Sequence, residues 1–225
     1  MRKKPIHPVP STVGNNRPRR LLFSACLWLV LFTPAAHADL RVQVEESVNG
    51  AEPAAVTHWF GKNRTMRDDG SRYIITSLRA QQSTIVNRET QTYQVVPLNL
   101  RVAKQLPEVL VTRTDDTDVI GQWPVRRYRL SGPATRELKI DIWVTQDVDV
   151  DFSAFRNLMI KLGNRPGSEW LKAYEIIEGF PILQQVELTR PGIRLLSESR
   201  VISLKELPPA EQNIYEPPDY YKRLR

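Results

Sequence analysis

Residues 137–163 read ELKIDIWVTQDVDVDFSAFRNLMIKLG, and the spacing of their apolar side chains changes part-way along. The first part, 137–145, is rich in β-branched residues and predicts a strand. The second part predicts an amphipathic helix, because its apolar residues recur every three to four positions: Phe152, Phe155, Leu158, Met159 and Leu162. Asp151 stands where an N-cap is expected and Gly163 where the helix should stop.

A second helix is predicted from Ser168 to Gly179, with Trp170, Leu171, Tyr174 and Ile177 on its apolar side. The linker 164–167 is short, so the two helices should form a hairpin. The stretch 98–106 is a further candidate for a short helix.

The rest of the chain reads as short strands joined by polar turns. The predicted strands lie at 40–45, 55–60, 64–67, 72–78, 83–87, 91–97, 109–113, 125–130, 137–145, 181–189 and 193–204, and the acidic residues 115–118 read as a loop. Short connections favour antiparallel pairing. We therefore predict an α+β fold: a large curved antiparallel sheet of about ten strands, a half-barrel, with the helical hairpin on its concave face.

The formal net charge of +7 comes from the first 38 residues, which hold six basic residues and no acidic one. Without them, 26 basic and 25 acidic residues remain, a formal charge of +1. Arg19-Arg20, the apolar run 21–32 and Ala36-His37-Ala38 together predict a signal peptide cut after Ala38. The apolar run is too short for a membrane span. A retained anchor is the less favoured alternative.

Export sets the expected location and the domain limits. We expect a periplasmic protein, or alternatively a secreted one, with no stable membrane span after cleavage. The half-barrel domain should cover 39–207, followed by an extended Pro- and Tyr-rich tail at 208–225. Cys26, the only cysteine, leaves with the leader, so no disulfide or thiol chemistry is expected. Either the secretory or the twin-arginine route remains open.

The mature sequence lacks the usual catalytic signatures. His58 is its only histidine, which excludes a two-histidine zinc site, and neither a nucleotide-binding glycine motif nor a G-x-S-x-G motif occurs. His58 is interpreted as a strand residue packed near aromatic rings. The run Asp147–Asp151 lacks the glycine and glutamate of a calcium loop. We predict no catalytic residue, metal site or cofactor.

Nucleic-acid binding is not expected either. Arg126, Arg127 and Arg129 surround Tyr128, a pattern that some nucleic-acid-binding surfaces share. In an exported chain of nearly zero charge, these arginines are better interpreted as the solvent-facing side of a strand or as partners of nearby carboxylates.

Seven segments follow one another along the chain: Ile120-Gly121, 125–130, 138–145, the helix pair, 179–182, 204–207 and 216–221. In this order they resemble a family of exported bacterial domains of unknown function, which is itself similar to the periplasmic lipoprotein carriers of the LolA/LolB type. The chain departs from the pattern at Pro218-Asp219, where the family often has glycine before the final tyrosine. The resemblance implies an open curved sheet covered by helices, whose concave face can hold an acyl chain.

Two functional hypotheses follow. The first is a non-enzymatic binding or carrier protein for a lipid, a lipoprotein acyl chain or another hydrophobic ligand, with residues 152–178 as a mobile lid. The residues expected to line its cavity are Tyr73, Ile75, Tyr128, Ile140 and Ile142. The alternative is a structural or adaptor protein with a filled core, which binds a cell-envelope protein through its surface or its tail. An enzyme that works with carboxylates, hydroxyls and lysines alone is the weakest option.

Overall fold

The computed structural model describes residues 39–101, 106–207 and 214–224. The chain divides into two compact units, Met1–Ala36 and His37–Arg225, and every described residue belongs to the second. The predicted signal peptide, part of the candidate helix at 98–106 and the first six residues of the tail lie outside the described residues.

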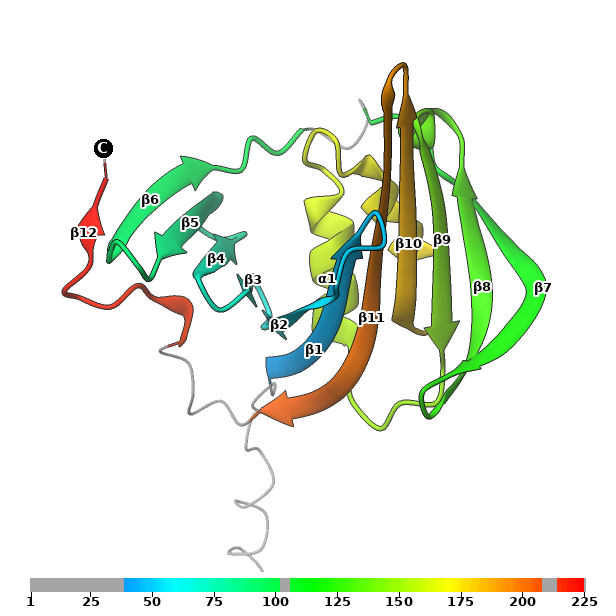
Figure 1. Ribbon diagram of the computed structural model, residues 1–225, viewed down its shortest axis with the longest axis horizontal. Helices are drawn as coiled ribbons and strands as arrows, with labels where there is room; N and C mark the ends of the chain where they lie inside the picture. The colour runs from blue at the N-terminus through cyan, green and yellow to red at the C-terminus, as the bar shows by residue number, and fades with distance from the viewer. Residues whose placement is uncertain (1–38, 102–105, 208–213, 225) are drawn as a thin grey trace, which may run out of the picture. The chain divides into compact units, whose positions relative to one another are not determined.

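A twelve-stranded sheet forms the body of this second unit (Figure 1). Its strands are β1 (Asp39–Val48), β2 (Ala54–Phe60), β3 (Arg64–Asp68), β4 (Arg72–Ser77), β5 (Gln82–Asn87), β6 (Thr92–Pro97), β7 (Leu110–Ile120), β8 (Trp123–Ser131), β9 (Leu138–Thr145), β10 (Phe180–Arg190), β11 (Ile193–Leu207) and β12 (Lys222–Arg223). The order in the sheet is β12-β6-β5-β4-β3-β2-β1-β11-β10-β9-β8-β7. All neighbours are antiparallel except β12 and β6, which are parallel.

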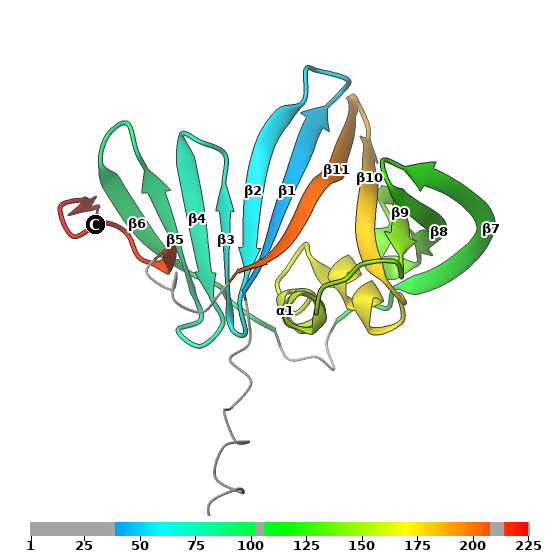
Figure 2. The same cartoon turned by 90° about the horizontal axis from the view of Figure 1, so that it is seen from below.

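The predicted open, antiparallel sheet is confirmed, but the strand count of about ten was too low. The sheet is open and bends around the helical segment, which lies on its inner side (Figures 1 and 2). One added strand, β12, comes from the tail. The predicted acidic loop at 115–118 is also wrong, because these residues belong to β7, which pairs with β8 across a register shift between Arg113 and Thr117. Asp118 pairs with Val125 of β8, whereas Asp115 and Asp116 lie within the register shift.

The predicted helical hairpin is only half α-helical. The first helix, α1 (Ser153–Leu162), forms as expected, and the second segment, η3 (Glu169–Glu175), is a 3₁₀ helix. A further 3₁₀ turn, η2 (Pro133–Thr135), connects β8 and β9. Phe152, not Asp151, is the N-cap of α1, although Asp151 still accepts a hydrogen bond from the Ser153 backbone N–H at 2.8 Å. No helix among the described residues is long and apolar enough to span a membrane.

Two separate clusters of buried side chains stabilise the sheet. The inner cluster joins the sheet to α1 and η3, and its large members include Phe60, Tyr128, Phe155, Tyr174 and Phe180. The outer cluster consists of Met66, Tyr73, Ile75, Val86 and Tyr215. Successive side chains of a strand point to opposite faces, so the outer cluster packs on the face of β3 and β4 that is turned away from α1.

The described part of the tail is an integral part of this outer layer. Tyr215 is buried in the outer cluster, and its ring lies 4.0 Å from the Arg64 guanidinium carbon. Further along, Lys222 and Arg223 form β12 and extend the sheet beside β6. Residues 214–224 therefore cover one face and one edge of the first half of the sheet.

Gly179, just before β10, occupies a position that only glycine fits. Its φ is 127°, and a Cβ there would lie 2.5 Å from the Thr145 carbonyl oxygen. We expect Gly179→Ala to lower the free energy of unfolding by about 2 kcal/mol, because both the backbone strain and the clash must be relieved. Chemical denaturation measures this. Gly192→Ala is the control for strain alone, since no atom lies within 4 Å of its Cβ position. Equal losses at both positions would contradict the role of the clash.

Candidate functional site

The candidate functional site is an apolar pocket of about 310 Å³ between the inner face of the sheet and α1. Its apolar lining consists of Val42, Val44, Phe60, Ile74, Phe155, Met159, Leu162, Tyr174, Phe180, Pro181, Ile182 and Val201. The volume lies at the lower end of the range typical of small-molecule sites. Strands β1 to β4, β10 and β11 supply one wall, and α1 and η3 supply the other.

Simple periodicities place these side chains. Val42 and Val44 are two residues apart in β1, so both point to the inner face. On α1, Phe155, Met159 and Leu162 are spaced by four and three residues and share one side of the helix. The pocket therefore forms where an alternating strand pattern meets a helical one.

Aromatic rings hold α1 against the sheet beside the pocket. The Phe155 ring meets Phe60 edge-on at 4.9 Å and Tyr174 edge-on at 5.4 Å, and lies 5.1 Å from Phe180. Burial raises the pKa of Tyr174 well above its ordinary value, so its hydroxyl stays neutral. This end of the pocket is uncharged and closely packed.

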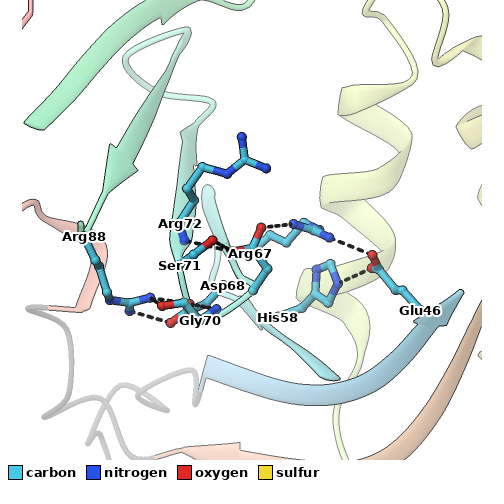
Figure 3. A network of polar contacts seen from close by, with 9 residues as sticks. Glu46, His58, Arg67, Asp68, Gly70, Ser71, Arg72 and Arg88 are labelled. Carbon is cyan, nitrogen blue, oxygen red and sulfur yellow. Dashed lines mark hydrogen bonds and ion pairs between the residues drawn. The ribbon is translucent and has the colours of Figure 1, made fainter. Parts of the chain in front are cut away.

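A polar network borders the pocket on β1, β2 and β3 (Figure 3). Glu46 accepts a hydrogen bond from Arg67 at 2.7 Å and lies 3.3 Å from the ring nitrogen Nε2 of His58. Arg67 also donates to Asp69 at 3.3 Å. The His58 ring stacks on Phe60 at 5.9 Å, which agrees with its interpretation as a packed strand histidine. His58 and Arg67 line the pocket, whereas Glu46 and Asp69, which form ion pairs with Arg67, are not among the lining residues.

The pKa of Glu46 is lowered from 4.5 to about 2, chiefly by the hydrogen bond with His58 and also by Arg67, against the opposing effect of burial. A depressed pKa stabilises the fold above the unfolded value, and this contribution disappears as the pH falls from about 4.5 to about 2. We expect unfolding measured across this window to show a loss of up to about 3 kcal/mol that Glu46→Gln lacks. Parallel acid profiles of the two proteins would contradict this assignment.

A second pocket, of about 530 Å³, lies at the β7–β8 turn and is larger but charged. Arg113 and Arg126 line it together with Asp118 and Glu178. Charges of both signs make it unsuitable for an apolar ligand, because each would be stripped of water by such a ligand. The smaller, apolar pocket is therefore the better candidate.

The structure does not bring together the five residues expected to line a ligand cavity. Tyr73 and Ile75 belong to the outer cluster, whereas Ile140 and Ile142 are completely buried in the inner cluster. Tyr128, also in the inner cluster, lines the second pocket. None of the five lines the apolar pocket.

The residues that do line it were overlooked for a physical reason. In β4, Ile74 and Thr76 face the pocket and Tyr73 and Ile75 face outward, although both pairs suit a buried face. A strand covered on both sides has no polar alternation to show which face is which. In β1, the alternation of Val42 and Val44 with Arg41 and Gln43 did carry the signal.

The described residues offer few groups for catalysis. No group of three His, Cys, Asp or Glu side chains in 39–101, 106–207 and 214–224 is arranged to hold a metal ion. The network around Glu46 pairs its carboxylates with Arg67 instead of aiming two free carboxylates at one point. This arrangement can enclose an apolar group beside a polar border whose arginine is already paired with two carboxylates.

Comparison with known proteins identifies the family. The profile of a family described as "Domain of unknown function (DUF4412)" matches residues 59–221. The chain belongs to this family. The resemblance to a domain of unknown function is thereby confirmed. A search of curated proteins gives no match to this DUF4412 chain.

Three solved structures are similar to this chain, and the one with a TM-score of 0.50 supports the fold. An uncharacterized conserved protein from Thermus thermophilus is 7% identical, with a TM-score of 0.50 over 84% of this chain and 90% of that one. A LolA superfamily protein from Nitrosomonas europaea is 10% identical, with a TM-score of 0.33 over 81% and 91%. PNGF-II is 9% identical, with a TM-score of 0.41. The match covers 83% of this DUF4412 chain but only 31% of that protein. The two matches with TM-scores below 0.5 support no inference about fold or function.

Proposed function

We propose that this DUF4412 protein is a non-enzymatic binding or carrier protein of the periplasm that holds a lipid, a lipoprotein acyl chain or another hydrophobic ligand. The observation that carries the proposal is the apolar pocket between sheet and α1. Side chains from eight elements, most of them apolar, line this pocket. The apolar walls of such a pocket face water, and a hydrophobic ligand would remove this surface from water.

The helical segment is the proposed lid. Arg156 of α1 donates two hydrogen bonds of 2.8 Å, to the backbone carbonyls of Tyr174 and Glu175. These bonds tie α1 to η3. Opening would therefore move the two together and separate Phe155 from Phe60.

Extraction of the purified protein tests the proposal. The chain would be expressed with its leader, purified without detergent from the periplasmic fraction, extracted with organic solvent and analysed by mass spectrometry. We expect a hydrophobic compound at up to one equivalent. Recovery from the cytoplasmic fraction alone would contradict the proposed location.

A pocket-filling variant makes the test specific. Thr65 lines the pocket, so Thr65→Trp should displace the ligand. Thr57 is also a half-buried strand threonine, but it is not among the lining residues, so Thr57→Trp should retain the ligand. Equal ligand recovery from both variants, or no ligand and no binding of a hydrophobic dye, would refute the carrier function.

The adaptor alternative needs a gentler test than removal of the tail. Residues 214–224 complete the outer cluster and the sheet edge, so truncation disturbs the fold as well as any partner site. Tyr220, which is 72% exposed, is the better probe. An adaptor that uses the tail should lose its envelope partner with Tyr220→Ala while the protein remains folded.

A further inference from the structure

We propose that the apolar pocket takes hydrophobic chains without an anionic end and rejects chains that end in a carboxylate, such as free fatty acids. The inference rests on the proposed function, because it names the class of ligand that the same pocket accepts. It follows from the charges that border the pocket.

Arg67 carries the only permanent charge among the described residues that line the pocket. A single arginine in an apolar pocket would ordinarily suggest a partner for an anionic head group. The surroundings of this arginine reverse that expectation.

Two carboxylates already neutralise Arg67. The Glu46 carboxylate lies 2.7 Å from one guanidinium nitrogen, and the Asp69 carboxylate lies 3.3 Å from the other. The formal charges of Glu46, Arg67 and Asp69 add up to −1. A ligand carboxylate placed against Arg67 would meet one cation and two anions.

Partial burial of these three side chains strengthens their repulsion of a ligand carboxylate. The side chains of Glu46, Arg67 and Asp69 are all half-buried, and the apolar pocket wall lies on one side of Arg67. Repulsion between like charges in such a setting is several times stronger than in bulk water. Glu46 cannot relieve it by taking up a proton near neutral pH, because its hydrogen bonds keep it ionised.

Three ligands with the same C18 chain separate charge from hydrophobicity: oleyl alcohol, oleylamine and oleic acid. Each would displace the neutral dye N-phenylnaphthylamine from the mature protein at neutral pH and at concentrations below micelle formation. We expect the alcohol and the amine to bind at least about tenfold more tightly than the acid. A pocket that merely disfavours any charge would reject the amine as well.

Glu46→Gln tests the origin of the selectivity. It keeps the shape and removes one negative charge, so the affinity for oleic acid relative to oleyl alcohol should rise by about tenfold. The matched control is Glu198→Gln. The Glu198 side chain is as exposed as that of Glu46, at 28%, and pairs with Arg200 at 3.2 Å, but it is not among the residues that line or border the pocket. For Glu198→Gln, the affinity for oleic acid relative to oleyl alcohol should equal that of the wild type.

Asp69→Asn provides a second route if Glu46→Gln does not fold, as judged by circular dichroism. It removes the other carboxylate on Arg67 and should change the ratio in the same direction. Either variant alone can therefore support or overturn the inference.

The outcomes separate the two proposals. If oleic acid binds the wild type as tightly as oleyl alcohol, or if the ratio is unchanged in the folded variant, the selectivity is refuted while the carrier function stands. If the dye and all three chains fail to bind, the carrier function itself fails.

Discussion

Phe155→Ala is expected to lower the free energy of unfolding by about 4 kcal/mol, among the largest effects of any single substitution in this chain. The phenyl ring of Phe155 contacts Phe60, Tyr174 and Phe180 at centroid distances of 5.4 Å or less, and the residue is buried. Its removal leaves a cavity. The surrounding backbone of β2, η3 and β10 is fixed by its own contacts and cannot move in to close it. The aromatic contacts are lost in addition to the buried area.

The same substitution should alter ligand binding, because Phe155 lines the apolar pocket. We expect the enlarged pocket to bind N-phenylnaphthylamine with altered affinity in the protein that remains folded. Phe152→Ala is the matched control on the neighbouring turn. Phe152 is only half-buried and has one ring contact, with Phe180 at 5.8 Å, so its loss should cost about 1–2 kcal/mol. Urea unfolding measures both, and an equal cost for the two would show that α1 is not anchored through Phe155.

Tyr215→Ala is expected to cost about 3–4 kcal/mol, although Tyr215 lies only ten residues from the C-terminus. The ring is buried against Met66, Tyr73, Ile75 and Val86 and lies over the Arg64 guanidinium. Without it, the outer face of β3 to β5 becomes exposed to water. Protease sensitivity of residues 214–224 should rise in parallel.

Two tyrosine variants serve as controls for this result. Tyr215→Phe keeps the ring over Arg64 and should retain most of the stability. Tyr220→Ala removes a ring that is 72% exposed and should stay within about 0.5 kcal/mol of the wild type. If Tyr215→Ala is as mild as Tyr220→Ala, the tail is not part of the folded core.

The layout of the fold was largely predictable because its signals are local. The alternation of Leu40, Val42 and Val44 marks a strand, and the spacing of Phe155, Leu158 and Met159 marks a helix. Both periodicities are properties of the backbone geometry alone. The short turns between strands then dictate antiparallel pairing.

The location of the site was less predictable. It depends on which distant segment covers each face of a strand. Tyr73 and Ile75 look like pocket residues because both are large and apolar, but Tyr215 covers them from a segment about 140 residues away. Likewise, Glu46 and Arg67 form an ion pair across three strands that no local pattern reveals. Tertiary contacts decided both cases.

The pairing of β1 with β11 at the centre of the sheet has a consequence for the order of folding. It joins Asp39 to Leu207 and Val48 to Ser197, so the first strand of the described chain gains its second neighbour only when nearly the whole chain is present. Contacts between such distant segments require closure of a long loop and slow the folding reaction. A chain that is synthesised or exported N-terminus first would lack its central strand pair until β11 becomes available. We therefore expect refolding in milliseconds to seconds and not in microseconds.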